Sequence, residues 1–216
     1  MEKRSELALF DLRPGKSDLK KLKILESVLL SIQLNGVEGT GFESVAKHLK
    51  MTRSNVNYYF STREEMIAAA IRIAVITQSQ LIDEKLAKAT EPRDKMPAFI
   101  EGNIAWAKKF PSHASGFLLF FFYSSITTRY LDIRESLIQN RVGQIETLLR
   151  QHYAKNIKHL SDAEVTELAW TLHAVVARRV LDASSVDSRH YARFVRDSKV
   201  GLLKVIHGFT AAGWSK

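Results

Sequence analysis

The chain is predicted to be all-α, with a three-helix N-terminal unit joined to a larger helical unit, about nine helices in all. Apolar residues recur at intervals of three or four along most of the chain. No run alternates as a half-buried strand would, and only four prolines and ten glycines interrupt 216 residues. A chain of this size buries roughly 70% of its unfolded surface, so it needs no disulfide to hold a core, and it has no cysteine.

The N-terminal part contains an arm and four helices. Residues 1–17 are expected to form a flexible, mixed-charge arm. Helices are expected over about 18–34, 42–49, 53–59 and 63–89. Their N-caps are expected at Thr40, Thr52, and Ser61 or Thr62, and Glu64 and Glu65 suit the first turn of the long helix.

Five further helices are expected over about 95–109, 113–125, 133–153, 162–181 and 188–209. The boundary between the two units is expected inside the long helix. We therefore expect an N-terminal domain over 18–66 and a second domain over 67–216.

The third helix has an unusual outer face. At 100° per residue Val56 points inward, with Phe60 one turn later. The opposite face holds Ser54, Asn55, Asn57 and Tyr58, bordered by Lys50 and Arg53. A short helix with such a face, after a tight connection, is typical of the helix-turn-helix that enters the DNA major groove. The alternative is an ordinary polar surface helix.

Residues 20–70 resemble the N-terminal domain of TetR-family transcriptional regulators. The resemblance rests on positions at fixed spacing without a gap: Gly36, Thr40, Phe42, Val45, Ala46, Met51, Thr52, Tyr58, Tyr59, Phe60, Thr62, Arg63, Glu64, Glu65 and Met66. The chain departs from the family pattern at Lys50, where glycine is frequent, at Gly41, where a second threonine is usual, and at Asn55 and Asn57.

The resemblance implies a double-stranded DNA operator as partner. It places Thr40, Tyr58, Tyr59 and Arg63 on phosphates and turns Arg53, Ser54, Asn55 and Asn57 toward the groove, with Lys50 and Thr52 beside them. The residues of the arm, Lys3, Arg4, Arg13 and Lys16, either follow an adjacent groove or form a solvated tail.

Net charge supports a polyanionic partner less directly. The chain carries a formal charge of +9 and has a pI near 9.7, which favours nucleic acid. Residues 1–66 nevertheless hold eleven Lys/Arg against nine Asp/Glu, so most of the excess lies in the second domain.

Residues 95–181 are rich in aromatic side chains, which can line a cavity for a small ligand. By the resemblance we expect an effector pocket there, lined by Phe99, Trp106, Phe117, Phe120, Phe121, Tyr123, Trp170 and His173. Plain core packing is the alternative, since Phe120, Phe121 and Phe122 span 200° of a helix and cannot share one pocket.

The last two long helices are expected to pair with those of a second copy. Their apolar stripes include Leu168, Leu172, Val176, Phe194, Leu202, Ile206 and Phe209. Two helices from each subunit would make a four-helix interface about a two-fold axis. The alternative is that the stripes only cover their own domain, and the resemblance favours the homodimer.

Catalysis, cofactors and membrane insertion find no support in the sequence. There is no HExxH, P-loop, GxGxxG or GxSxG motif. The most apolar run, Phe117–Tyr123, is far below the ~20 residues of a membrane span. We expect a cytoplasmic protein that is not an enzyme and uses no metal or cofactor.

The function expected is that of a sequence-specific transcriptional regulator, a repressor released from its operator by a small apolar or amphipathic effector. The alternative is a DNA-binding protein without an effector, whose second domain binds a protein partner or spreads along DNA.

Overall fold

A computed structural model of the chain describes residues 16–211. All regular structure in this range is helical, as predicted. The expected arm, 1–17, lies outside the described residues except for Lys16 and Ser17, which already belong to the first helix. The helices are α1 Lys16–Asn35, α2 Phe42–Leu49, α3 Arg53–Asn57, α4 Arg63–Lys88, α5 Lys95–Lys109, α6 Pro111–Ser125, α7 Leu131–His152, α8 Ala154–Ile157, α9 Asp162–Ala183 and α10 Ser188–Ala211. A 3-10 turn, η2, covers Pro92–Asp94, and the four-residue α8 is the helix that the sequence did not predict.

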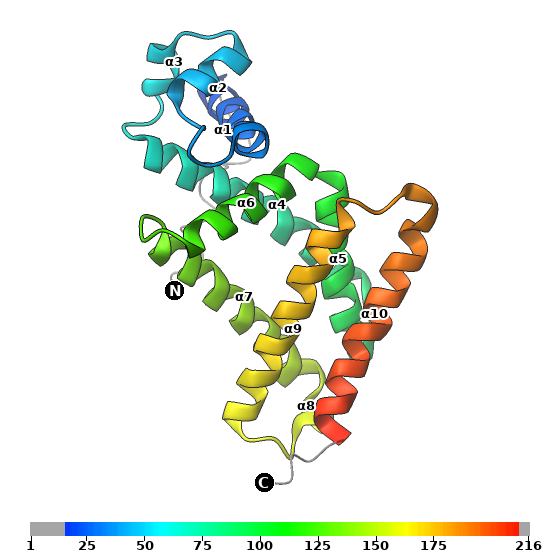
Figure 1. The fold of residues 1–216 in the computed structure, drawn as a ribbon. Helices are drawn as coiled ribbons and strands as arrows, with labels where there is room; N and C mark the ends of the chain where they lie inside the picture. The colour runs from blue at the N-terminus through cyan, green and yellow to red at the C-terminus, as the bar shows by residue number, and fades with distance from the viewer. Residues whose placement is uncertain (1–15, 212–216) are drawn as a thin grey trace.

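Helices α1 to α3 form a small unit, hereafter the head, at one end of the molecule (Figure 1). Its core is made of apolar side chains that the helical period placed inward, including Ile24, Val28, Ile32, Val45, Val56 and Phe60. Helix α1 ends at Asn35, and the next residue, Gly36, has a φ of 71° and so takes the left-handed conformation that glycine tolerates best.

Helix α4 belongs to both parts of the molecule. It starts beside the head, where the Thr62 hydroxyl accepts a hydrogen bond from the Glu65 N–H at 3.1 Å, and continues into the larger unit, hereafter the body. There it packs very closely against α5. A Cβ built on Gly102 would lie 2.6 Å from the Ile82 Cα, so only glycine fits this crossing.

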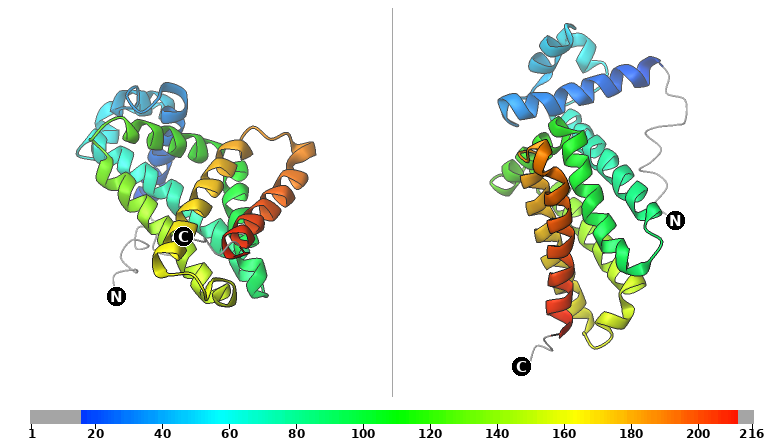
Figure 2. Two further views of the ribbon diagram at one scale, coloured as in Figure 1. Left: turned by 60° about the horizontal axis from the view of Figure 1, so that its bottom comes forward. Right: turned by 90° about the vertical axis from the view of Figure 1, so that its right-hand side faces the viewer.

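The body is a bundle of α4 to α10. Helix α5 contacts α4, α9 and α10, and α7 packs against α9. Helix α6 lies under α1, and α1 runs crosswise over the long helices of the body (Figure 2). At Gly116 of α6 an added Cβ would meet the Leu29 carbonyl oxygen at 3.0 Å, so the head rests on the body almost backbone to backbone.

By length and composition alone, α4 could cross a membrane, which was not expected from the sequence. Half of its most apolar stretch is buried within the bundle. This burial is what the core helix of a globular domain shows.

Candidate nucleic-acid interface

The connection between α2 and α3 turns at Lys50. This residue has φ 53° and ψ 41°, and it is the only non-glycine residue with positive φ among residues 16–211. The turn closes with hydrogen bonds from the Lys50 N–H to the Lys47 carbonyl at 3.3 Å and from the Met51 N–H to the Ala46 carbonyl at 2.9 Å. A left-handed conformation costs an L-residue about 1–2 kcal/mol. The backbone is therefore strained at Lys50, the position where TetR-family regulators frequently have glycine.

Helix α3 presents the outer face that the sequence predicted. Arg53, Ser54, Asn55 and Asn57 are exposed, and so is Tyr58, with 82% of its surface accessible. Val56 and Phe60 are buried beneath them. The helix ends at Asn57, two residues before the predicted end, and Tyr58 and Tyr59 follow in a turn with their rings 5.2 Å apart. Lys50 and Thr52 are also exposed at the start of this face.

The cap of α3 is as predicted, and the cap of α2 is not. The Thr52 hydroxyl accepts a hydrogen bond from the Asn55 N–H at 3.3 Å. The N-cap of α2 is Gly41 rather than Thr40, and its N–H donates to the Ser44 hydroxyl at 2.9 Å. Thr40 is only 1% exposed, because its hydroxyl is bonded to the Gly36 carbonyl at 2.8 Å and to the Ser31 hydroxyl at 3.1 Å. Its side chain is not presented to a phosphate, which corrects that expectation.

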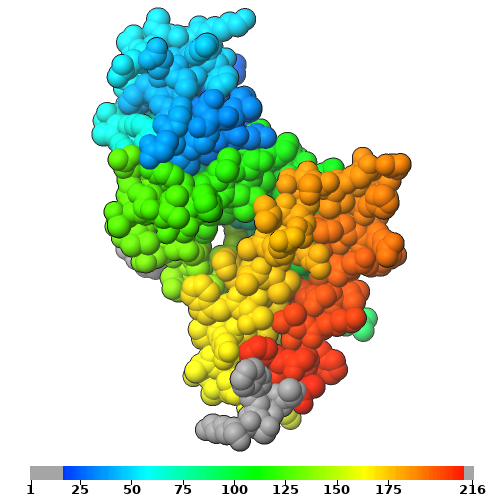
Figure 3. Space-filling view, in the orientation of Figure 1, coloured from blue at the N-terminus to red at the C-terminus, as the bar shows by residue number. Residues whose placement is uncertain are grey.

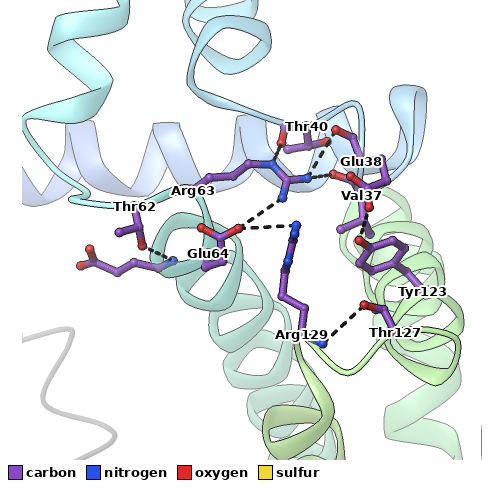
Figure 4. A network of polar contacts seen from close by, with 10 residues as sticks. Val37, Glu38, Thr40, Thr62, Arg63, Glu64, Tyr123, Thr127 and Arg129 are labelled. Atoms are coloured by element: carbon purple, nitrogen blue, oxygen red, sulfur yellow. Dashed lines mark hydrogen bonds and ion pairs between the residues drawn. The ribbon is translucent and has the colours of Figure 1, made fainter.

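Arg63 likewise differs from the expected phosphate contact. Its Nε donates to the Thr40 carbonyl at 2.6 Å and its Nη2 to the Val37 carbonyl at 2.5 Å, so the guanidinium holds the loop between α1 and α2 against the start of α4 (Figure 4). Its Nη1 lies 3.6 Å from the Glu64 carboxylate. The guanidinium therefore serves contacts within the protein.

Two sets of polar contacts join the head to the body. In the first, the Tyr123 hydroxyl of α6 donates to the Glu38 carboxylate, which raises the pKa of the tyrosine. Beside this bond, Arg129 lies 3.7 Å from Glu64, at the start of α4 where this helix meets the head (Figure 4). In the second, buried His113 of α6 binds Glu26 of α1 through Nε2 at 2.6 Å. Its Nδ1 lies 3.1 Å from the Thr77 hydroxyl of α4, which also accepts from the Trp106 indole at 3.0 Å. The helices α1, α4, α5 and α6 are thus linked by one chain of hydrogen bonds.

A hollow of about 620 Å³ lies beside α2. Its lining includes the exposed residues Lys47 and His48, together with Gly39. Neither side chain was predicted as a site residue, although the helical period of α2 places Lys47 on the face opposite buried Val45. They add a cation to the side of the head that carries Lys50.

The aromatic side chains expected to line an effector pocket differ in how far they are buried. Phe99, Trp106 and Phe120 are fully buried core residues, which favours plain packing for these three. Phe117, Phe121 and Tyr123 are partly buried, with Phe117 5.9 Å from Trp106 and 4.6 Å from Phe121 between ring centres. Trp170 is 40% exposed on α9, with its ring 6.2 Å from that of His173. His173 is partly buried, and burial together with nearby Arg141 lowers its pKa.

The interior contains a polar network that the sequence analysis missed. The Asn103 amide donates to the Phe99 carbonyl at 2.9 Å and accepts from the Gln78 amide at 3.0 Å. The Gln78 carbonyl oxygen accepts in turn from Arg141 at 2.6 Å. The sequence did contain one sign of this network, because the charged residue Arg141 directly precedes Val142, a buried residue of the apolar stripe of α7.

Most of the residues predicted for the dimer interface lie inside their own bundle. Leu168, Leu172, Val176, Leu202 and Ile206 are buried, and Phe194 and Phe209 are partly buried. This corrects the prediction for the five buried residues, because the stripe that looked available for a partner is the one that packs on the body. The exposed apolar residues of these helices are others, with Trp170 and Leu181 on α9 and Val200 and Leu203 on α10. Helices α9 and α10 form much of the body surface that faces the viewer in Figure 3.

Two curated relatives match part of the chain. The "HTH-type transcriptional regulator BetI" of Paraburkholderia xenovorans is 25% identical over 91 residues, and that of Paraburkholderia phymatum is 23% identical over 90. Each match covers 41% of this chain and 46% of the relative, so the chain spans about half the length of the curated relatives it matches. No family model matches the chain.

Solved structures resemble nearly the whole chain. A transcriptional regulator from Pseudomonas aeruginosa PAO1 has a TM-score of 0.75 at 13% identity, covering 98% of this chain and 97% of its own. A TetR-like regulator from Rhodococcus sp. RHA1 has a TM-score of 0.70 at 11% identity, with coverages of 93% and 100%. A regulator from Saccharomonospora viridis, solved in complex with choline, has a TM-score of 0.65 at 16% identity, with coverages of 87% and 95%. The predicted fold class and the resemblance to TetR-like regulators are confirmed: this chain has their fold.

Proposed function

We propose that this chain, which has the fold of the TetR-like regulators, is a sequence-specific DNA-binding transcriptional regulator. It would act in the cytoplasm as a homodimer and as a repressor that an effector releases. The observation that carries the proposal is the exposed face of α3, supported from below by buried Val56 and Phe60 and set after the strained turn at Lys50. An exposed set of Arg, Ser and Asn side chains on a short helix is suited to reading base edges.

The head would dock with α3 in the major groove. Asn57 and Asn55 offer amides that can bind adenine in bidentate fashion, whereas the Tyr58 hydroxyl suits a phosphate oxygen. This divides the face into residues that select the sequence and residues that fix the position of the head. The chemistry of each side chain predicts its effect on specificity.

Selection of DNA by the purified protein tests this proposal. Sequencing of bound fragments from a random pool should give a palindromic motif. Asn57→Ala should change the base preference within each half-site, since it removes a base-reading amide while leaving the tyrosines in place. Asn156→Ala, at an exposed asparagine of α8, is the matched control and should select the unchanged motif. An identical motif for Asn57→Ala and the wild type would contradict the proposed docking.

The homodimer is proposed on the outer face of α9. Trp170, Ala174, Ala177 and Leu181 recur at three or four residues and are all exposed, so they form an apolar stripe outside the bundle. A second copy of the same stripe would cover it about a two-fold axis. Such a dimer suits two half-sites about one helical turn, ~34–36 Å, or a multiple of it apart.

Release by an effector is proposed through the contacts that join head and body. The His113–Glu26 bond and the Tyr123–Glu38 bond both connect α6 to the head, so a shift of α6 would move both. A tenfold loss of operator affinity needs only about 1.4 kcal/mol of coupling, which is the size of one or two such bonds. The Saccharomonospora neighbour, a regulator of this fold, was solved in complex with choline, which supports the binding of a small molecule.

A DNA-binding protein without an effector is the second candidate. It is favoured by Phe122 and Ile126, which are strongly exposed at the end of α6 and would suit a protein partner. Measuring operator affinity with and without a small molecule distinguishes the two candidates. A small molecule that binds the body and lowers operator affinity supports the regulator with an effector. Regulation lost in Phe122→Ser, with operator binding intact in vitro, supports the second.

A further inference from the structure

The inner side of α7 carries two arginines. Arg134 and Arg141 are seven residues apart, which is about two helical turns and a rise of ~10.5 Å along the same face. Both side chains are partly buried. Two guanidinium groups on one interior stripe are unusual, because arginine is seldom buried without an acidic partner.

Arg141 has neutral partners only. Its Nη1 donates to the Gln144 carbonyl oxygen and its Nη2 to that of Gln78, both at 2.6 Å, and its guanidinium lies 5.9 Å from the centre of the Phe99 ring. Within residues 16–211 no carboxylate forms an ion pair with it, and three of its five N–H donors are left without an acceptor. Burial lowers the pKa of Arg141 to about 10, partly offset by Asp83, so the group is still charged at neutral pH.

A second observation points to the same region. The Tyr130 hydroxyl and the Arg134 Nε are buried, and neither has a hydrogen-bond partner in the described part of the chain. Leaving such a donor unpaired costs about 1–3 kcal/mol. Tyr130 lies at the start of α7, one turn before Arg134, so the unpaired donors continue the line that leads to Arg141.

The surroundings of this line combine an opening with apolar walls. Figure 3 shows a narrow opening in the body between the segment of α6 and α7, in green, and α9, in yellow. Arg141 of α7 and His173 of α9 come from the helices on its two sides, and the charge of Arg141 contributes to the lowered pKa of His173. That histidine is therefore neutral at pH 7. The rings of Phe120, on α6, and Tyr130, directly before α7, lie 5.3 Å apart.

We propose that the interior between α6, α7 and α9 binds a small organic anion, a carboxylate with an apolar body. Its carboxylate would take the free N–H groups of Arg141, with Arg134 and Tyr130 as further donors, and its apolar part would lie against the aromatic rings. A carboxylate supplies the opposite charge that Arg141 lacks and matches its planar fork. The site rejects cations for the same reason. This inference rests on the proposed function, since the anion would be the effector.

The test measures ligand binding directly, without DNA. The full chain is titrated in a calorimeter with straight-chain carboxylates from hexanoate to dodecanoate, and with alkyltrimethylammonium ions of the same chain lengths. At least one carboxylate should bind the wild type tenfold or more tightly than its ammonium counterpart. Arg141→Gln should weaken that carboxylate at least tenfold. Arg178→Gln, which removes the same charge from an exposed position of α9, should leave it unchanged.

The proposal is overturned if no carboxylate is preferred over its ammonium counterpart, or if Arg141→Gln binds the carboxylate as tightly as the wild type. Should Arg141→Gln fail to fold, the comparison of the two ligand series on the wild-type chain decides alone. Carboxylate binding by a protein that selects no DNA would keep the anion site and refute the proposed regulator. DNA selection without anion preference would do the reverse.

Discussion

Replacing Arg63 by alanine separates two roles that the same residue could have. The resemblance to TetR-like regulators implies that its charge holds a DNA phosphate. In the structure its guanidinium instead donates to the Val37 and Thr40 carbonyls, 26 and 23 residues away in sequence. We therefore expect Arg63→Ala to loosen the head, and to weaken operator binding through that loss of order.

The size of the effect follows from the two bonds. A hydrogen bond from a charged group contributes about 1.5–3 kcal/mol, and the side chain of Arg63 is 21% exposed, so water competes for part of this. We expect a loss of about 2 kcal/mol in the stability of the head. For a chain of this size, about 2–4 °C per kcal/mol corresponds to a melting temperature lowered by ~4–8 °C if the head unfolds with the body.

The assay combines thermal unfolding with a salt titration of operator binding by fluorescence anisotropy, between about 50 and 200 mM salt. Arg63→Ala should melt earlier, and should bind more weakly at every salt concentration with the wild-type slope of log K against log salt. Arg72→Ala is the matched control, because it removes an exposed arginine from the same helix. Arg63→Lys should not restore stability, since one ammonium cannot span two carbonyls as the planar fork does.

The opposite outcome would refute this reasoning. A phosphate contact would flatten the salt slope by about 0.9, leave the melting temperature equal to that of Arg72→Ala, and be largely restored by lysine.

Three further substitutions test the packing, the turn and the dimer. Gly102→Ala should lower stability by about 1–3 kcal/mol, because the added Cβ would meet the backbone of α4. Gly143→Ala is the control and should raise stability by about 0.5–1 kcal/mol, because nothing lies within 4 Å of the added Cβ. Equal melting temperatures for the two variants would contradict the close crossing of α4 and α5. Lys50→Gly should stabilise the protein by roughly 0.5–1 kcal/mol, because glycine adopts the left-handed backbone conformation of this turn without strain. Lys47→Gly, inside α2, should destabilise the protein by a similar amount. Urea unfolding measures both changes. Trp170→Glu should give a monomer in light scattering at micromolar concentration, and an unchanged dimer mass would remove the outer face of α9 from the interface.

The fold and the outer face of α3 could be predicted because both follow from local periodicity. The spacing of Val56 and Phe60 fixes which side of a short helix is buried, and therefore which residues are left outside. The turn at Lys50 could also be located, since the resemblance places a glycine there and the backbone is left-handed.

The contacts made across long stretches of sequence could not be predicted. Thr40 and Arg63 look like free polar side chains until folding brings the α1–α2 loop beside α4. The stripe of Leu168, Leu172 and Val176 shows that one face of α9 is buried. Periodicity does not tell whether this face packs against the same subunit or against another one. The network around Arg141 joins α4, α5 and α7, so no single helix reveals it.

The continuity of α4 has a mechanical consequence. One helix of 26 residues, α4, starts beside the head and ends in the body. At 1.5 Å per residue it is ~39 Å long and acts as a lever. A tilt of about 5° at its far end would displace the head by ~3 Å, close to the ~3.4 Å step between successive base pairs. In the proposed dimer, a rearrangement of the body smaller than a side chain would thus be enough to put the two heads out of register with their half-sites.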